Sequence, residues 1–335
     1  MDLEASYQDI IEDVARINGY DNIPTTIASI SSKGGLTYKQ KRVRLTRQLF
    51  SSMGLNEVVS YSLVAKKDLY TYTTEEKTPV EVLMPMTEDK AVMRQSLLNG
   101  VLDALLHNKA RKVENISFFE IGNTYSKEEE VLKLAGAFTG LYTNLQWANI
   151  KLPVDFYVVK GLLDAYFARM NVTVSYKPYD GNKNLHPGRT AAIYLNNKMI
   201  GIIGELHPRH AKSIDLNSAV VFEIELKDLV EKETKFEYEI LNKFPTSSRD
   251  LALICDINLN CDDVVTLIKK TGKSALANIQ IFDLYVGENI EADKKSLGIT
   301  LTFENKERTL TSEEIDELIN RILNKLKKEL NVYLR

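Results

Sequence analysis

The 335-residue sequence is poor in cysteine, lacks long apolar runs and carries little net charge. Its two cysteines, Cys255 and Cys261, have no second pair, and their spacing fits neither a zinc knuckle nor a redox CxxC motif. So few cysteines are typical of a reducing compartment. No apolar run approaches the ~18–20 residues of a membrane span, and the first four residues show no signal peptide. We therefore expect a cytoplasmic protein that has no membrane partner.

The near-absence of net charge argues against a broad electrostatic surface for nucleic acid. The formal net charge is −3, and the stretch from residue 243 onwards holds 14 Lys and Arg against 15 Asp and Glu, a net charge of −1. Nucleic-acid-binding domains are often basic, so composition alone does not predict RNA binding here. Hydrophobic residues at 44% and charged residues at 27% are ordinary for a globular protein.

Helical and strand-like patterns alternate over the first two thirds of the chain. A capping box at Thr37 and Gln40 predicts a helix that stops at Gly54, and Asn196-Asn197 predicts the turn of a hairpin over 191–204. Further helices are predicted near 96–112 and 154–170, and further strands near 58–63, 80–84, 117–125, 133–141, 172–176 and 219–226. This mixture predicts an α+β domain built on an antiparallel sheet.

The last third of the chain has a regular order of elements. Strands are predicted at 251–255, 279–285, 297–303 and 331–334, with helices at 261–270 and after a capping box formed by Thr311 and Glu314. This βαββαβ order is that of a ferredoxin-like fold.

The sequence opens on a predicted helix, Tyr7–Asn18, which we interpret as the tail of a domain whose front is absent. Asp9, Glu12 and Asp13 fall at positions i, i+3 and i+4, so their carboxylates share one helix face. Three such oxygens suit a hard cation such as Mg²⁺, although a solvated acidic face explains the same pattern.

Nine short motifs follow one another along the chain. They are DIIEDVARINGYDNIP (9–24), MRQSLL (93–98), FFEIG (118–122), LHPGRTA (185–191), GELHP (204–208), SSRDLAL (247–253), FDLYVG (282–287), KKSL (294–297) and RTLT (308–311). In this order they resemble the β subunit of bacterial phenylalanine–tRNA ligases, from its metal-binding helix to its C-terminus. The resemblance covers essentially all 335 residues. The N-terminal tRNA-binding and editing modules of the family are absent from this sequence.

The resemblance implies a division into five parts. These are the tail of the Mg²⁺-binding domain (1–28), a linker (29–36), a class II synthetase-like core (37–232), a second linker (233–242) and a ferredoxin-fold anticodon-binding domain (243–335). It also implies an α2β2 heterotetramer with a catalytic α subunit, which attaches phenylalanine to tRNA(Phe) with ATP.

The core is expected to be non-catalytic. Class II enzymes place one phosphate-binding Arg on the strand after the helix and another in a Gly-rich element near the end of the domain. Here the strand at 118–126 contains no Arg, and the strand at 220–226 contains neither glycine nor Arg. Because phosphate is best bound by the planar fork of arginine, we expect no catalytic residue in this chain and no ATP bound by it.

The resemblance assigns two sets of site residues. The Mg²⁺ ligands shared with the α subunit match Asp9, Glu12 and Asp13, and a fourth ligand would be Asp2 only if one residue is inserted, because Leu3 stands at the matching position. No bound metal is expected without the α subunit. The residues that contact the guanine of the anticodon match Ala252, Asp283, Tyr285 and Ser296.

The chemistry of Asp283 and Tyr285 indicates how the anticodon-contacting residues could bind guanine. Asp283 and Tyr285 share one face of a strand, where Asp can accept from the N1 and N2 donors of guanine and Tyr can stack on a base. A half-buried strand aromatic and an acid near a turn would show the same pattern. Arg249 and Asp250 are expected to form a local pair that positions the first strand.

Several other residues could suggest chemistry. His186, His207 and His210 are interpreted as residues of structural turns, and Arg189 as one half of a surface ion pair. A basic helix either touches RNA or presents a solvated or subunit-facing side; its cations are Lys39, Lys41, Arg42, Arg44 and Arg47.

Two other functions are consistent with parts of the pattern. An independent class II-like enzyme would need the missing arginines. A stand-alone regulatory or interaction protein could use a ferredoxin-like domain to bind a small ligand, because this fold hosts many functions.

Overall fold

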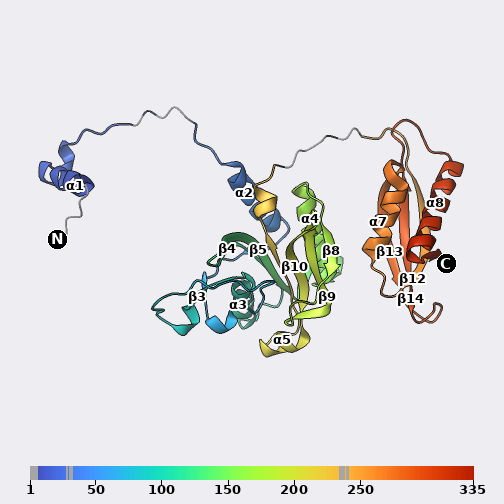
Figure 1. Ribbon diagram of the computed structural model, residues 1–335, viewed down its shortest axis with the longest axis horizontal. Helices are drawn as coiled ribbons and strands as arrows, with labels where there is room; N and C mark the ends of the chain where they lie inside the picture. Colours follow the sequence, from blue (N-terminus) through green and yellow to red (C-terminus); the bar gives the residue numbers. More distant parts are fainter. Residues whose placement is uncertain (1–6, 28, 30–32, 234–237, 239–240) are drawn as a thin grey trace.

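The computed structural model describes residues 7–27, 29, 33–233, 238 and 241–335 (Figure 1). The first helix, α1 (Tyr7–Asn18), has the predicted bounds and is followed by a 3-10 helix, Tyr20–Asn22. Helix α1 has no buried residue. Its apolar stripe of Ile10, Ile11, Val14 and Ile17 is exposed to solvent.

The core contains a seven-stranded sheet in the order β1-β4-β5-β11-β10-β9-β8. The strands are β1 (Asn56–Glu57), β4 (Ile116–Tyr125), β5 (Glu130–Thr139), β8 (Ser175–Pro178), β9 (Leu185–Leu195), β10 (Lys198–Leu206) and β11 (Val220–Glu225). The pair β1–β4 at one edge is parallel, and the other five pairs are antiparallel. The predicted antiparallel sheet is therefore present, with one parallel edge strand.

Helices cover both faces of this sheet. They are α2 (Tyr38–Ser52), α3 (Leu98–Lys109), α4 (Phe156–Arg169), α5 (Pro208–Ser213) and α6 (Lys227–Val230). One face packs against α2 and α4 through an aromatic cluster that includes Phe50, Phe119, Tyr166 and Phe222. The opposite face is lined by small side chains of β5, such as Ala135, and is covered by α3 and α5. Burial of these two apolar layers holds the core together.

Local sequence signals account for the ends of several elements. Thr37 and Gln40 form the predicted capping box of α2. Asn196 and Asn197 both have positive φ, 49° and 65°, as a two-residue type I′ hairpin between β9 and β10 requires. Both predictions are confirmed. They could be made from the sequence because the geometry of a helix cap or a tight turn depends on adjacent residues.

The strand predicted over 80–84 is wrong. Only Glu81 forms a bridge, with Val92, and the side chains of Leu83 and Met84 are exposed. Between residues 58 and 93 the structure has only the two-residue strands β2 (Leu63–Val64) and β3 (Val92–Met93) and the 3-10 helices Lys66–Asp68 and Glu88–Lys90. The partner strand β3 is only two residues long and Leu83 and Met84 have no buried face, so the pairing does not extend beyond Val82.

The hairpin β6 (Leu141–Leu145) and β7 (Ile150–Pro153) was not predicted. It turns through the 3-10 helix Gln146–Ala148, and Asn149 adopts a left-handed conformation. The side chain of Trp147 at this turn is exposed. Short strands that bury little apolar surface leave a weak periodic signal, which explains the omission.

The C-terminal part confirms the predicted βαββαβ order. Its sheet has the order β13-β14-β12-β15, built from β12 (Ser247–Asp256), β13 (Leu276–Tyr285), β14 (Lys294–Phe303) and β15 (Tyr333–Leu334). Helices α7 (Cys261–Gly272) and α8 (Ser312–Leu330) pack on one face of this sheet (Figure 1), and a 3-10 helix covers Lys273–Ala275. Among the residues described from 241 to 335, no helix packs on the other face of this sheet.

The start of α8 provides a direct test of local stabilisation. The side chain of Thr311 accepts from the backbone N–H of Glu314, and the Glu314 side chain accepts from the Thr311 N–H. Thr311→Ala should lower the free energy of unfolding by about 1 kcal/mol. Chemical denaturation followed by circular dichroism would measure the change, with Thr309→Ala outside the helix as the control. Equal effects of the two substitutions would contradict this role for the cap.

No helix in the described ranges is long and apolar enough to cross a membrane.

Candidate functional site

The open face of the C-terminal sheet brings the four predicted RNA-contacting residues together. Asp283 pairs with Gly298, which in turn pairs with Ala252 on β12. Tyr285 pairs with Ser296 in the next row. Alternation along β12 buries Leu251, Leu253 and Cys255 against the helices and exposes Ala252. The four residues therefore occupy two neighbouring rows on the side of the sheet that faces away from α7 and α8, where Ser296 itself is only 4% exposed.

A β-bulge at Phe282 places Asp283 and Tyr285 on this side. The register of β13 against β14 shifts between Ile281 and Asp283, so Phe282 is the extra residue. Ile281 pairs with the buried Ile299, on the helix side. Without the bulge, the two-residue period would put Asp283 on the same side as Ile281.

Gly298 leaves room for the bulge. A Cβ at this position would lie 2.9 Å from the Cβ of Asp283 and 2.9 Å from a ring carbon of Phe282. The Phe282 ring therefore lies over Gly298 on the open face, where 56% of the residue is exposed. It adds a second aromatic ring to the site. Sequence analysis missed Phe282 because a bulge has no signal in the period of the strand.

The predicted local pair between Arg249 and Asp250 is wrong. Arg249 donates to the carbonyl of Ser248 at 3.1 Å, and Asp250 accepts from the Thr300 hydroxyl at 2.7 Å. Consecutive residues of a strand point to opposite faces, so Asp250 finds its partner on the neighbouring strand instead.

In the core, two buried glutamates lie on the two strands that lack the phosphate-binding arginines of class II enzymes. Glu120 on β4 and Glu223 on β11 both pair with Ala135 of the strand between them, so they lie in one row of the sheet. Glu120 is 1% exposed and Glu223 is 6% exposed. Buried carboxylates require partners of opposite charge, because removing them from water is costly.

Each glutamate has such a partner. Arg94 Nη1 lies 2.7 Å from Glu120 Oε1, and the Ser60 hydroxyl donates to the other oxygen of the same carboxylate at 2.6 Å. Lys133 Nζ lies 2.9 Å from Glu223 Oε2. The remaining oxygen of Glu223 accepts from the Ser96 hydroxyl at 2.9 Å and from the Leu97 backbone N–H at 2.6 Å. Both cations are thus neutralised by the sheet itself.

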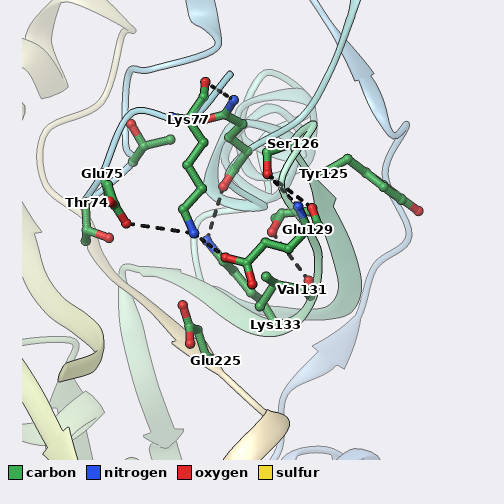
Figure 2. A pocket seen from close by; sticks show the side chains of 12 residues that line it. Thr74, Glu75, Lys77, Tyr125, Ser126, Glu129, Val131, Lys133 and Glu225 are labelled. Carbon is green, nitrogen blue, oxygen red and sulfur yellow. Dashed lines mark hydrogen bonds and ion pairs between the residues drawn. The ribbon is translucent and has the colours of Figure 1, made fainter. Parts of the chain in front are cut away.

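The space next to this row is a small cavity of about 50 Å³ (Figure 2). Lys77 reaches into it and pairs with Glu129 and Glu75, and the hydrogen bond to Glu129 raises the pKa of Lys77. A water occupies about 30 Å³ in the liquid, and ligand pockets span about 300–1,000 Å³. The cavity can therefore hold one or two waters but no nucleotide.

Two larger hollows lie elsewhere in the core. One, of about 760 Å³, is at the edge formed by β8 and β9, where Arg189 is paired with Glu205 at 2.8 Å. The other, of about 810 Å³, lies beside α3, where Lys90 Nζ lies 4.9 Å from the centre of the Tyr61 ring. In both hollows these cations already have a partner within the chain.

The three histidines make structural contacts, but His186 lies in β9 and His210 in α5 rather than in the predicted turns. His207 accepts from the Arg209 N–H at the start of α5, and His186 accepts from the Gly188 N–H. His210 is hydrogen-bonded to the hydroxyl of Tyr72 at 2.6 Å, and burial lowers its pKa. The ion pair predicted for Arg189 is confirmed.

The basic helix α2 uses three of its five cations inside the chain. Lys39 pairs with Glu231 and Arg47 pairs with Glu57, while Arg42 donates to the carbonyl of Met170. Lys41 and Arg44 are exposed. A broad basic surface for RNA is not formed by this helix.

The predicted Mg²⁺ ligands Asp9, Glu12 and Asp13 lie on one face of α1, and Asp13 is paired with Arg16 at 2.7 Å. Within the residues that the structure describes, no group of three or more His, Cys, Asp or Glu side chains could hold a metal ion. The fourth candidate, Asp2, lies outside the described residues. The assignment of these four residues to a Mg²⁺ site therefore stays a prediction.

Comparisons with known proteins agree with this two-part organisation. The family described as "Phenylalanyl tRNA synthetase beta chain CLM domain" matches residues 23–226, and the "Ferredoxin-fold anticodon binding domain" matches residues 242–335. The chain is 39% identical over 338 residues to the phenylalanine–tRNA ligase beta subunit of Geobacillus kaustophilus. It is 36% identical over 337 residues to the beta subunit of Bacillus subtilis. Each alignment covers 98% of this chain and 42% of the relative.

An anticodon-binding domain that follows a synthetase-type core defines a component of an aminoacyl-tRNA synthetase. The chain belongs to the phenylalanyl-tRNA synthetase beta chain family. It spans less than half of the length of these relatives. A solved pyrrolysyl tRNA synthetase from Desulfitobacterium hafniense has 16% identity and a TM-score of 0.42, over 56% of this chain and 66% of that chain, which is too distant to define the fold.

Proposed function

We propose that this chain is the part of a phenylalanine–tRNA ligase β subunit that holds the catalytic α subunit and contacts the anticodon of tRNA(Phe). The complex would attach phenylalanine to tRNA(Phe) with ATP, in the cytoplasm, as an α2β2 heterotetramer. The observation that carries the RNA-binding part is the placement of Asp283 and Tyr285 beside Ala252 and Ser296 on the helix-free face of the sheet.

The chemistry of this face suits a splayed guanine. Within the described part of the chain, the carboxylate of Asp283 has no hydrogen-bond or ion-pair partner, so its oxygens are free to accept from the N1 and N2 donors of the base. Phe282 offers a ring face for stacking, as in other proteins that bind single-stranded RNA, and the Tyr285 hydroxyl can donate to a base. Contacts of this kind to a single base do not require a basic domain, which accounts for the net charge of −1.

The substitution Asp283→Ala tests this assignment. It should weaken binding of tRNA(Phe) to the full chain about tenfold or more and remove the preference for guanosine, because a base-reading contact is worth about 1–3 kcal/mol. Filter binding would measure the affinity. Asp316→Ala removes the same charge from an exposed site on α8 and serves as the control. Equal affinities of the two variants would refute the site, and a chain that binds an amino acid but no tRNA would favour the regulatory alternative.

For the core, we propose a class II synthetase-like domain over 37–232 that has lost adenylation chemistry, with linkers at 29–36 and 233–242 before the anticodon-binding domain at 243–335. One observation supports the loss. The strands that would carry phosphate-binding arginines instead carry the buried Glu120 and Glu223. A carboxylate repels the charge that develops on a transferring phosphate.

The α subunit is also the proposed source of the missing metal ligands. Asp9, Glu12 and Asp13 on α1 offer three carboxylates on one helix face, which is a typical contribution to a Mg²⁺ site that is completed by other groups. When bound, the ion would join the two subunits.

A further inference from the structure

The side chain of Arg335 crosses the open face of the C-terminal sheet. Its backbone N–H donates to the carbonyl of Ala252 at 2.8 Å, next to the pairing of β15 with β12. Its guanidinium carbon lies 5.6 Å from the centre of the Tyr285 ring, on β13 at the far edge of the same sheet. Strand β14, which carries Ser296 and Gly298, lies between β12 and β13. The arm of Arg335 therefore spans the rows that hold the four proposed anticodon contacts.

The guanidinium lies within cation–π range of the Tyr285 ring, and this contact leaves its N–H donors available. A cation over an aromatic ring is attracted by the electrons of the ring, and this leaves the N–H groups at the rim of the guanidinium unused. No side-chain hydrogen bond or ion pair of Arg335 occurs among the described residues. Arg335 does not pair with the nearby Asp283 either, so each keeps its capacity for a ligand.

Other cations near this face already have partners. Lys294 lies 3.7 Å from the Asp293 carboxylate and is largely buried. Lys295 donates to the carbonyls of Ile257 and Leu259 at 2.9 and 2.6 Å. Arg335 thus presents an exposed positive charge with free donors beside Tyr285.

We propose that Arg335 binds the phosphodiester group next to the base that Asp283 and Tyr285 hold. The inference rests on the proposed RNA-binding function of this face. A planar fork of N–H donors matches the oxygens of a phosphate, and a base seated on this face brings its own backbone phosphate with it. Phosphate contacts position a nucleic acid without reading its sequence. In a domain without a basic surface, one pre-oriented arginine supplies this contact.

Binding of two stem–loop RNAs by the full chain tests the proposal. The RNAs carry guanosine or adenosine at the position that Asp283 reads, and their affinities are measured over a range of salt concentrations. Arg335→Gln should lower the affinity for both RNAs about tenfold and reduce the slope of log affinity against log salt by about 0.7. The preference for guanosine over adenosine should persist. The anchoring hydrogen bond of Arg335 uses its backbone, so the substitution leaves the strand pairing intact.

Arg321→Gln is the matched control, because it removes one exposed positive charge from α8 on the other side of the sheet. If Arg335→Gln behaves like Arg321→Gln, or if it weakens only the guanosine RNA and leaves the salt slope unchanged, the phosphate contact is wrong. Asp283→Ala separates the two proposals. If it leaves the guanosine preference unchanged, the proposed anticodon site itself fails. If it removes the preference while Arg335→Gln has no effect, only the role of Arg335 is overturned.

Discussion

Arg94→Ala is expected to lower the free energy of unfolding by about 3–5 kcal/mol, because it leaves the carboxylate of Glu120 buried without its counter-charge. Glu120 is 1% exposed and pairs with Arg94 at 2.7 Å. Arg94 also donates to the carbonyl of Asn123 and to the hydroxyl of Ser60, both at 2.9 Å, so the substitution removes three contacts together. Urea denaturation followed by circular dichroism would measure the loss.

Two further variants make this test specific. Arg189→Ala breaks a surface ion pair and should have a much smaller effect, since exposed pairs are screened by water. The double variant Arg94→Met, Glu120→Leu removes both charges and should recover most of the stability, because an apolar pair needs no charge compensation. An Arg94→Ala protein as stable as Arg189→Ala would show that the pair is not what holds this part of the core.

Glu223→Ala should destabilise the core by about 3–5 kcal/mol, because one carboxylate serves three donors there. Its loss removes the ion pair of the partly buried Lys133 ammonium, and it frees the Ser96 hydroxyl and the Leu97 N–H beside the first turn of α3. Glu223→Gln keeps an acceptor for the two neutral donors and removes only the charge. Its loss of stability should therefore be intermediate.

Denaturation curves of the three proteins would rank them as native, Glu223→Gln and Glu223→Ala. Glu225→Ala, two residues along the same strand, is the control; its carboxylate is 34% exposed and lies 3.6 Å from Lys198. An effect of Glu223→Ala no larger than that of Glu225→Ala would contradict the role of Glu223 as a shared buried acceptor.

The buried ion pairs that stabilise the core also bear on its proposed loss of adenylation chemistry. Charges that complement one another inside the sheet occupy the place where an adenylating enzyme would keep arginines free for phosphate. Arg94 is a cation in this region, but Glu120 neutralises it. Under the proposed function, this domain would hold a partner subunit, and RNA contact would be made by the separate C-terminal sheet.

Sequence patterns predicted the elements whose causes are local. The capping boxes of α2 and α8, the Asn196-Asn197 turn and the βαββαβ order of the last third are all present. The strand predicted at 80–84 is wrong because its partner β3 is only two residues long, and apolar composition does not report the length of a partner. The hairpin β6–β7 was missed because its strands are short and mostly exposed.

For the candidate site, the family resemblance singled out Ala252, Asp283, Tyr285 and Ser296, and strand alternation placed Asp283 and Tyr285 on one face. Neither identified Phe282 or Arg335. The first lies on the open face because of a bulge, and the second reaches Tyr285 across two intervening strands.

The amino-acid sequence by itself determined the order and type of most elements and the absence of arginine from two strands, because capping, periodicity and composition act between near neighbours in the chain. Only the tertiary structure decided that Glu120 and Glu223 are buried beside cations from other segments, and that Arg335 lies over Tyr285. Such contacts join residues 26 to 90 positions apart, or strands at opposite edges of a sheet, and their geometry depends on register and packing that no local pattern encodes.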